Sequence, residues 1–249
     1  MNVLREADRV PAQLAEFTIT ATNLPEHARN PIHTDAGAQA AGFPRALVAG
    51  VTTYAYLTHP MLAAWGTDWL AAGGAEVRFR RPVFDGDVLR CTPVVNGDHL
   101  VVEARTDEPE QPRAVVAVTR RSSPPAALRA GEPLRPIELE LADEWGSDYA
   151  SRAGDQLPLC RDLGVVHPAV WPALANNVVH TQVARGSWIH MRSIVRHHAL
   201  APVGATATVR AVVVRRFEAH GERAVLDVEI TADGVVVATL EHEAIVALA

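Results

Sequence analysis

Hydrophobic and polar positions alternate over much of the chain, and two long apolar stretches interrupt this alternation. A period of two predicts strands that are buried on one face, whereas a long apolar stretch predicts a buried helix. In the first half, residues 13–22 alternate as a strand, and residues 47–65 predict a helix rich in Ala, Val and Leu. Four further strands are predicted after Gly73, over residues 75–83, 87–95, 99–106 and 113–120.

The second half of the chain repeats this order of elements. A strand is predicted over residues 139–143, a helix over 145–153 and a second, apolar helix over 166–179. Four alternating stretches then predict strands over residues 187–196, 206–216, 223–231 and 235–247. The tight-turn dipeptides Asn96-Gly97 and Asp233-Gly234 predict β-hairpins between neighbouring strands.

A proline-rich linker separates the two halves. Residues 122–136 contain four prolines and two serines, a composition typical of an extended connection. We therefore divide the chain into an N-terminal repeat over residues 1–121, the linker over 122–136, and a C-terminal repeat over 137–249. The order within each repeat suits an antiparallel sheet wrapped around one central helix. The predicted class is α+β, with two such units of roughly 110 residues fused in one chain.

Composition and charge exclude several classes of function. The 249 residues carry a net charge of -6 and have an isoelectric point near 6.0, so we expect neither nucleic acid nor a membrane as a partner. All 23 basic residues are arginines, which excludes Schiff-base and P-loop lysine chemistry. Cys91 and Cys160 form no Cys-x-x-Cys motif, which favours the reducing cytoplasm. No signal peptide and no transmembrane helix are expected.

Residues 30–50 carry the candidate chemistry. Asn30-Pro31 forms a rigid turn directly before His33, because proline fixes its own φ and restricts the preceding residue. A short helix over residues 36–41 and a break at 42–44 then lead to the long helix. The start of a helix offers free N–H groups and the positive end of a dipole. A histidine on a rigid loop that faces such a helix start is a candidate acid–base group.

The sequence NPIHTD from Asn30, with Gly42-Phe43 and Gly50 after it, resembles the signature of the MaoC-like family, the (R)-specific enoyl-CoA hydratases and dehydratases. The resemblance implies a fused double hot dog, two antiparallel sheets each wrapped around a central helix. It also implies an acyl thioester of CoA or acyl carrier protein as the partner and no cofactor. Two positions depart from the signature: Ala28 replaces the family's aspartate, and Ala49 replaces a histidine at the head of the central helix.

The C-terminal repeat keeps the other half of the pattern. Residues 153–160 align with the same signature and retain Asp155, but Cys160 stands at the histidine position. Residues 167–177, HPAVWPALANN, resemble the central helix of polyketide-synthase dehydratase domains, with Pro172 at the position of their catalytic aspartate. Each repeat thus retains one member of the family's His–Asp dyad.

By this resemblance His33 is the acid–base residue, with Asn30 to orient it, and Gly50 and Ala49 contact the thioester. Hydration needs a base for the water, an acid for the α carbon and donors for the enolate oxygen. An imidazole has an ordinary pKa of about 6.5 and suits the proton transfers.

The missing carboxylate has two candidate replacements, Glu26 beside it in the sequence and Asp155 from the other repeat, and we favour Glu26. If the fold matches the family, Ala28→Asp should raise activity about tenfold or more. Arg78 and Arg80 are candidate contacts for the phosphates of the carrier.

Each of these residues also has a plainer interpretation. His33 could cap a carbonyl, Asn30 its own turn, and Gly50 could serve helix packing. Asp155, Glu26 and the neighbouring His27 could be solvated, and the arginines could lie on a sheet edge. A further cluster, His190, His197 and His198, lacks carboxylates at ligand spacing, so no metal is expected. With a period of two, His190 and His198 share a face and His197 points away.

Three functions remain open. The first is a hydratase or dehydratase of enoyl or 3-hydroxyacyl thioesters. The second is an acyl-thioester-binding subunit without catalysis, suggested by the replacements at Ala28, Cys160 and Pro172. The third is a hot-dog thioesterase. Because two fused repeats supply both halves of a hot-dog dimer, we expect a monomer or a homodimer.

Overall fold

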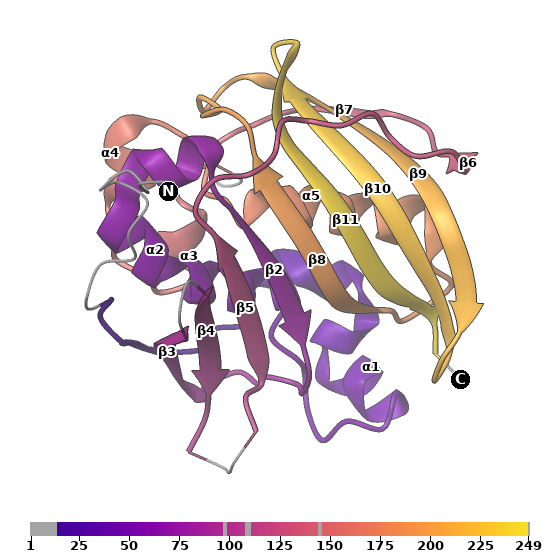
Figure 1. Ribbon diagram of the computed structural model, residues 1–249. Coiled ribbons are helices and arrows are strands. Elements are labelled where there is room, and N and C mark those ends of the chain that lie inside the picture. The colour runs from indigo at the N-terminus through magenta and orange to yellow at the C-terminus, as the bar shows by residue number, and fades with distance from the viewer. Residues whose placement is uncertain (1–13, 97–98, 108–110, 144–145, 249) are drawn as a thin grey trace.

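The two repeats share one curved antiparallel sheet (Figure 1). The computed structural model describes residues 14–96, 99–107, 111–143 and 146–248. The strands of the N-terminal repeat are β1 (Phe17–Thr20), β2 (Gly74–Phe79), β3 (Val88–Asn96), β4 (His99–Arg105) and β5 (Ala114–Thr119). The linker contributes β6 (Glu132–Pro133), and the C-terminal repeat contributes β7 (Ile137–Glu140), β8 (Ile189–His197), β9 (Thr206–Glu218), β10 (Glu222–Ala232) and β11 (Val235–Ala247).

The order of the strands shows where the repeats meet. In the described residues it runs β1-β3-β4-β5-β2-β8-β11-β10-β9-β6, with β7 also on β9. The strands β2 and β8 pair antiparallel, from Gly74 opposite Arg196 to Arg78 opposite Arg192. The predicted double hot dog is confirmed, with one difference: its two sheets are joined edge to edge, because the first strand after each central helix pairs with its counterpart.

Both predicted hairpins lie between paired strands. Asn96 is opposite His99 in the register of β3 and β4, while Gly97 lies outside the described residues. The turn between β10 and β11 holds Asp233 and Gly234 at positive φ, the conformation that such a turn requires.

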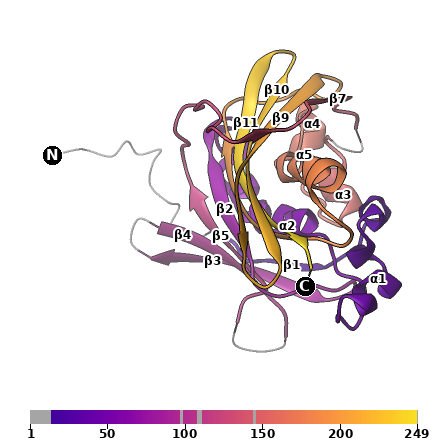
Figure 2. The same ribbon diagram turned by 90° about the vertical axis from the view of Figure 1, so that its right-hand side faces the viewer.

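Helices cover one side of the sheet, as Figure 2 shows. The N-terminal repeat has the short helices η2 (Pro25–Arg29), η3 (Pro31–His33) and α1 (Asp35–Ala40), and the long helix α2 (Gly50–Ala72). The C-terminal repeat has α3 (Tyr149–Arg152), α4 (Leu159–Leu163), α5 (Val170–Val178) and the π-helical turn η4 (Val179–Val183). Trp145, where a helix was predicted to begin, lies outside the described residues.

The central helix α2 begins and ends later than its apolar pattern predicts. Leu47 is extended and bridges to Phe84, and Val48 donates its N–H to the carbonyl of Val83, so the helix begins only at Gly50. Gly66 has a φ of 51°, which kinks the helix where the apolar pattern stops, and the chain then continues helically to Ala72. These extended residues before Gly50 fix the position of the helix start.

The linker crosses the outer face of the C-terminal repeat, opposite the helices (Figure 1). Arg129 anchors it there, donating from Nε to Asp227 at 2.8 Å and from Nη2 to Glu241 at 2.6 Å. Within the described residues, no helix has the length and hydropathy needed to cross a membrane.

Candidate functional site

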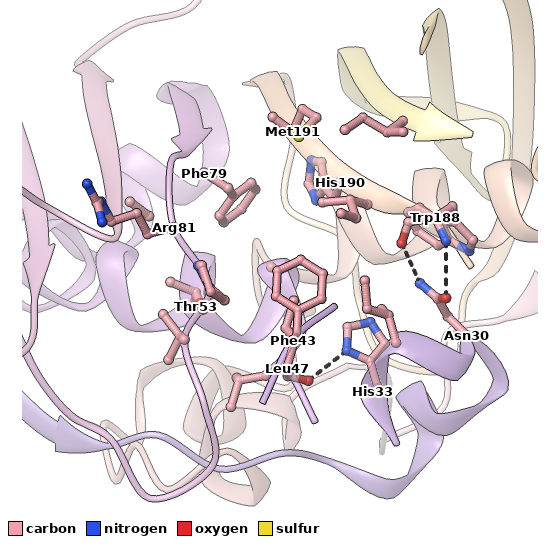
Figure 3. A pocket seen from close by; sticks show the side chains of 18 of the residues that line it. Asn30, His33, Phe43, Leu47, Thr53, Phe79, Arg81, Trp188, His190 and Met191 are labelled. Atoms are coloured by element: carbon pink, nitrogen blue, oxygen red, sulfur yellow. Dashed lines mark hydrogen bonds between the residues drawn. The ribbon is translucent and has the colours of Figure 1, made fainter. Parts of the chain in front are cut away.

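A cavity of about 340 Å³ lies where the two repeats meet. Its walls come from η3, the start of α2, the end of β2 and the start of β8, as Figure 3 shows. Most of the lining is apolar, including Ile32, Phe43, Leu47 and Phe79. The polar lining side chains contribute the smaller part of the cavity surface, as is typical of a site for a small molecule with a large apolar part.

His33 is held in this cavity in one orientation. Its backbone N–H donates to the carbonyl of Asn30 at 3.0 Å, which closes the short helix that Pro31 begins. Its Nδ1 lies 2.8 Å from the carbonyl oxygen of Leu47 (Figure 3). Because a carbonyl only accepts, Nδ1 carries the proton and Nε2 of the neutral ring is unprotonated. The ring therefore offers a base at Nε2.

Burial determines the charge of this ring. It lowers the pKa of His33 below its ordinary value, and the hydrogen bond to Leu47 offsets only part of this effect. His33 is thus neutral at neutral pH and can accept a proton. The neighbouring His27, whose ring centroid lies 5.8 Å away, is also neutral, since burial and the repulsion from His33 lower its pKa to about 4.

The start of α2 forms the opposite wall of the cavity. Gly50 is its first residue, and the first N–H groups of a helix have no acceptor within the helix. A Cβ atom at this position would lie 3.1–3.3 Å from atoms of the Phe79 ring, so glycine allows that ring to pack against the helix start. Ala49 is buried directly before Gly50 and is not part of the cavity lining. The helix start can accept a developing oxyanion.

Asn30 connects the repeats. Its Nδ2 donates to the carbonyl of Trp188 at 2.9 Å, and the N–H of Trp188 donates to its Oδ1 at 3.4 Å (Figure 3). Asn30 therefore pairs with the backbone that leads into β8 and does not contact the ring of His33 through these bonds. Its side chain, which is 3% exposed, holds the two walls of the cavity together.

The two candidate acids lie away from His33. Oδ2 of Asp155 lies 2.8 Å from Nδ1 of His59, and its Oδ1 accepts the N–H of Leu157. Oε1 of Glu26 accepts from Arg152 at 2.7 Å. Burial opposes the ionisation of Glu26, yet the hydrogen bond from Arg152 keeps its pKa below the ordinary value. Neither carboxylate lines the cavity. The favoured candidate, Glu26, pairs with Arg152, and the alternative, Asp155, pairs with His59, so neither is the expected partner of His33.

The lining contains no carboxylate among the residues that the structure describes. At the position of the family's aspartate, Ala28 is exposed, while the preceding His27 is buried and lies 3.3 Å from both Thr52 Oγ1 and Tyr149 Oη. The buried polar side chain beside the expected aspartate position is therefore a neutral imidazole.

Of the two arginines expected at the site, only one reaches it. Arg80 lines the cavity and is exposed, and its guanidinium has no ion pair or hydrogen bond among the described residues. Arg78 is exposed on β2 and forms an ion pair with Glu76 at 2.5 Å. Arg81 and Arg223 also line the cavity, so its wall carries three guanidinium groups, of which that of Arg223 forms an ion pair with Glu243 at 2.8 Å.

His190 lines the cavity, which its sequence pattern did not predict. The pairing of β8 with β11 shifts between Glu243 and Ala244, which leaves Met191 as an extra, bulged residue. Beyond a bulge the alternation of faces reverses. His190 therefore shares its buried face with His197 and not with His198, contrary to the prediction. A strict period of two contains no signal for the bulge.

Comparison with known proteins agrees with this geometry. Residues 6–117 match the sequence model of the family described as "MaoC like domain". The N-terminal repeat is a MaoC-like domain. No curated protein matches the chain.

Solved structures resemble the chain over almost its whole length. A MaoC-like dehydratase is 13% identical, with a TM-score of 0.57 over 94% of this chain and 98% of its own. RV0216, a conserved hypothetical protein from Mycobacterium tuberculosis with a double hot-dog fold, is 13% identical, with a TM-score of 0.60 over 94% and 96%. A candidate oleoyl thioesterase from Lactobacillus plantarum is 11% identical, with a TM-score of 0.53 over 96% and 98%. Such similarity confirms the double hot dog around the MaoC-like domain.

Proposed function

We propose that the cavity binds an acyl thioester and adds water to, or removes it from, the α and β carbons of the acyl chain. The observation that carries this proposal is the orientation of His33. Its Nδ1 is fixed on the Leu47 carbonyl at 2.8 Å, which leaves a neutral, basic Nε2 in a mainly apolar cavity. A base in such a position can move a proton near neutral pH.

The proposed hydration uses His33 twice. Nε2 takes a proton from water as the oxygen bonds to the β carbon of the enoyl thioester. The thioester carbonyl becomes an enolate, whose oxygen lies at the start of α2 beside Gly50. The imidazolium of His33 then returns its proton to the α carbon. Dehydration of a 3-hydroxyacyl thioester is the reverse.

The carrier of the acyl chain binds at the charged wall in this proposal. Arg80, which has no partner among the described residues, supplies a guanidinium for a phosphate of CoA or of the phosphopantetheine group of an acyl carrier protein. Arg78 is a weaker candidate, since Glu76 already pairs with it. Arg80→Ser should raise the KM for an acyl-CoA and leave kcat nearly unchanged.

The decisive experiment is a hydration assay with crotonyl-CoA and longer enoyl-CoAs. We expect turnover that falls by about 10²–10⁴-fold in His33→Asn. Asparagine can still donate to the Leu47 carbonyl, so this variant preserves the loop. Release of free thiol from saturated acyl-CoAs is measured alongside. Thiol release without hydration would identify a thioesterase, and equal turnover by wild type and His33→Asn would refute the role of His33.

A second candidate is an acyl-thioester-binding subunit without catalysis. The absence of a carboxylate from the described lining favours it, because the family's dyad pairs histidine with aspartate. It predicts binding of acyl-CoA by calorimetry with no hydration and no thiol release. Turnover by the purified chain alone excludes it.

The cellular setting of this function is proposed from the same features. Because β2 and β8 already join two hot dogs, the chain is proposed to act as a monomer or a homodimer. Cys91 and Cys160 are buried free thiols, in keeping with the cytoplasm. Sedimentation that shows an obligate higher oligomer would contradict the first statement.

A further inference from the structure

A hydrogen-bonded network of three polar side chains, His190, Ser193 and His242, lies on the inner face of the sheet of the C-terminal repeat, next to the cavity. Nε2 of His190 lies 2.8 Å from Oγ of Ser193, and the same Oγ lies 2.9 Å from Nδ1 of His242. His190 and Ser193 come from β8 and His242 from the neighbouring β11. All three side chains are buried, and the rings of the two histidines lie 4.3 Å apart.

The bulge at Met191 makes this network possible. Without the extra residue, His190 and Ser193 would lie on opposite faces of β8, because their spacing of three is odd. The shifted register places both on the inner face, and it brings His190 beside Phe79 at 4.7 Å between ring centroids. Bulges next to functional sites commonly re-aim a side chain in this way.

The His190–Ser193–His242 network has two arrangements of its protons. Ser193 has one hydroxyl proton, so its oxygen accepts from one imidazole and donates to the other. If His190 donates through Nε2, its Nδ1 is a bare acceptor. If His242 donates through its Nδ1, the hydroxyl donates to His190, and Nδ1 of His190 carries a proton. Both rings remain neutral in each arrangement. Conversion moves the proton of each imidazole to its other nitrogen and turns the Ser193 hydroxyl from His242 to His190.

Two lining side chains have a buried polar atom that forms no hydrogen bond of normal geometry among the described residues, although the backbone of Arg192 lies close to the ring of His190. These atoms are Nδ1 of His190 and Oδ1 of Asn176. A buried polar atom without a hydrogen bond is costly, so such atoms on the wall of a cavity point to a ligand that satisfies them. We propose that His190 is a specificity-determining residue, which binds through Nδ1 an oxygen on the acyl chain, such as the hydroxyl of a 3-hydroxyacyl thioester.

The hydrogen bonds of His190 to Ser193 and of Ser193 to His242 give His190 a property that a single histidine lacks. Because Ser193 can either accept from or donate to Nε2 of His190, with His242 in the matching tautomer, both tautomers of His190 keep this hydrogen bond. Nδ1 can therefore donate to an oxygen that accepts or accept from a hydroxyl that donates. The residue can thus bind the substrate hydroxyl and also the water that replaces it. This inference rests on the proposed function, and it assigns the recognition of oxygen to a different repeat from the one that carries His33 (Figure 3).

The test compares two ligands that differ in one hydroxyl. Binding of butyryl-CoA and (R)-3-hydroxybutyryl-CoA is measured by calorimetry in the His33→Asn background, which stops turnover. We expect the hydroxylated ligand to bind roughly tenfold more tightly. His190→Phe should abolish this preference, and it leaves Ser193 and His242 bonded to each other. His197→Phe is the matched control, since His197 is buried on the same face of β8 and does not line the cavity.

A second readout follows the protons themselves. In ¹⁵N spectra of the histidine rings, (R)-3-hydroxybutyryl-CoA should shift the nitrogens of His190 and His242 together, and butyryl-CoA should leave them unchanged. Ser193→Ala should remove the response of His242 only. These spectra decide the question on folded protein if His190→Phe does not fold.

The possible outcomes separate the inference from the function on which it rests. Equal binding of the two ligands, or a preference that survives in His190→Phe, overturns the role of His190 and leaves acyl-thioester binding intact. If neither ligand binds, both the role of His190 and the proposed function are overturned.

Discussion

Nδ1 of His59 lies 2.8 Å from Oδ2 of Asp155, which is 1% exposed, so the aspartate that aligns in sequence with the family's dyad pairs with a helix of the other repeat. The ring of His59 also stacks on Phe17 at 3.7 Å between centroids. This pair connects the middle of α2 to the loop before α4. Its contacts are those of a structural link between the repeats.

We therefore expect substitution of Asp155 to affect stability more than activity. Asp155→Ala removes the acceptor for both His59 and the N–H of Leu157, and should lower the free energy of unfolding by about 3 kcal/mol. Glu26→Gln breaks a half-buried ion pair with Arg152 and should cost about 1 kcal/mol or less. Urea titrations measure both changes. Abolished turnover in a folded Asp155→Asn protein would instead assign Asp155 to catalysis.

Ala28→Asp puts the family's aspartate back at its position in the sequence, but we do not expect its carboxylate to reach the cavity. Ala28 is exposed, so the carboxylate of Ala28→Asp begins on the solvent side of η2. The exposure of Ala28 replaces the tenfold rise expected from the sequence with a change in turnover of less than about threefold, well below the effect of a positioned catalytic carboxylate. Initial rates with crotonyl-CoA measure it. A rise of tenfold or more would show that the loop can turn this position inward.

The activity should persist on the acid side of the ordinary histidine pKa. Burial lowers the pKa of His33, so its basic form is retained as the pH falls below about 6.5. The acid limb of kcat/KM, which reports the free enzyme, should therefore lie below that pH. The limb should be absent from the pH dependence of butyryl-CoA binding. A limb at or above pH 6.5 would contradict the assigned environment of His33.

Four buried histidines should make the folded protein sensitive to acid. Burial lowers the pKa of His27, His167 and His197 to about 4, and that of His242 to about 3. In the unfolded chain these rings bind protons below about pH 6.5, while in the folded protein they stay neutral. The contribution of the four rings to the free energy of unfolding is therefore complete above pH 6.5. It is lost as the pH falls toward 4, at about 1.4 kcal/mol per pH unit for each ring.

Urea titrations at pH 7.5 and 5.5 measure this loss. His197→Phe should make the decline in stability shallower by the share of one ring, because it removes one of the four histidines. The Trp69 carbonyl that accepts from His197 keeps a donor in this variant, since it also accepts the N–H of Gly73. Equal stability at the two pH values would refute the prediction.

Gly50→Ala should narrow the cavity. The new methyl group would lie 3.1–3.3 Å from the Phe79 ring, so the ring must move away from the helix start. We expect acyl-CoA binding to weaken roughly tenfold, the usual scale of overpacking. Gly50→Ala combined with Phe79→Leu should recover most of the affinity, as measured by calorimetry. No recovery would mean that Gly50 acts through its own backbone and not through the ring.

Local patterns in the sequence predicted most of the fold. The periods of two and of a helix identified both central helices and nearly every strand, because one face of each element is buried. The Asn30-Pro31 turn and the position of Gly50 also placed His33 near a helix start without any structure. These features depend on neighbours within a few residues, which the sequence displays directly.

Tertiary contacts decided what surrounds His33. The partner of Asp155 is 96 residues away in the chain, and that of Asn30 is 158 residues away. Composition and spacing do not specify contacts over such separations. The bulge at Met191 likewise depends on how β8 pairs with β11, and it alone brings His190 to the cavity. The sequence by itself determined the double repeat and the position of its histidine, while packing between the repeats decided which side chains share the cavity with it.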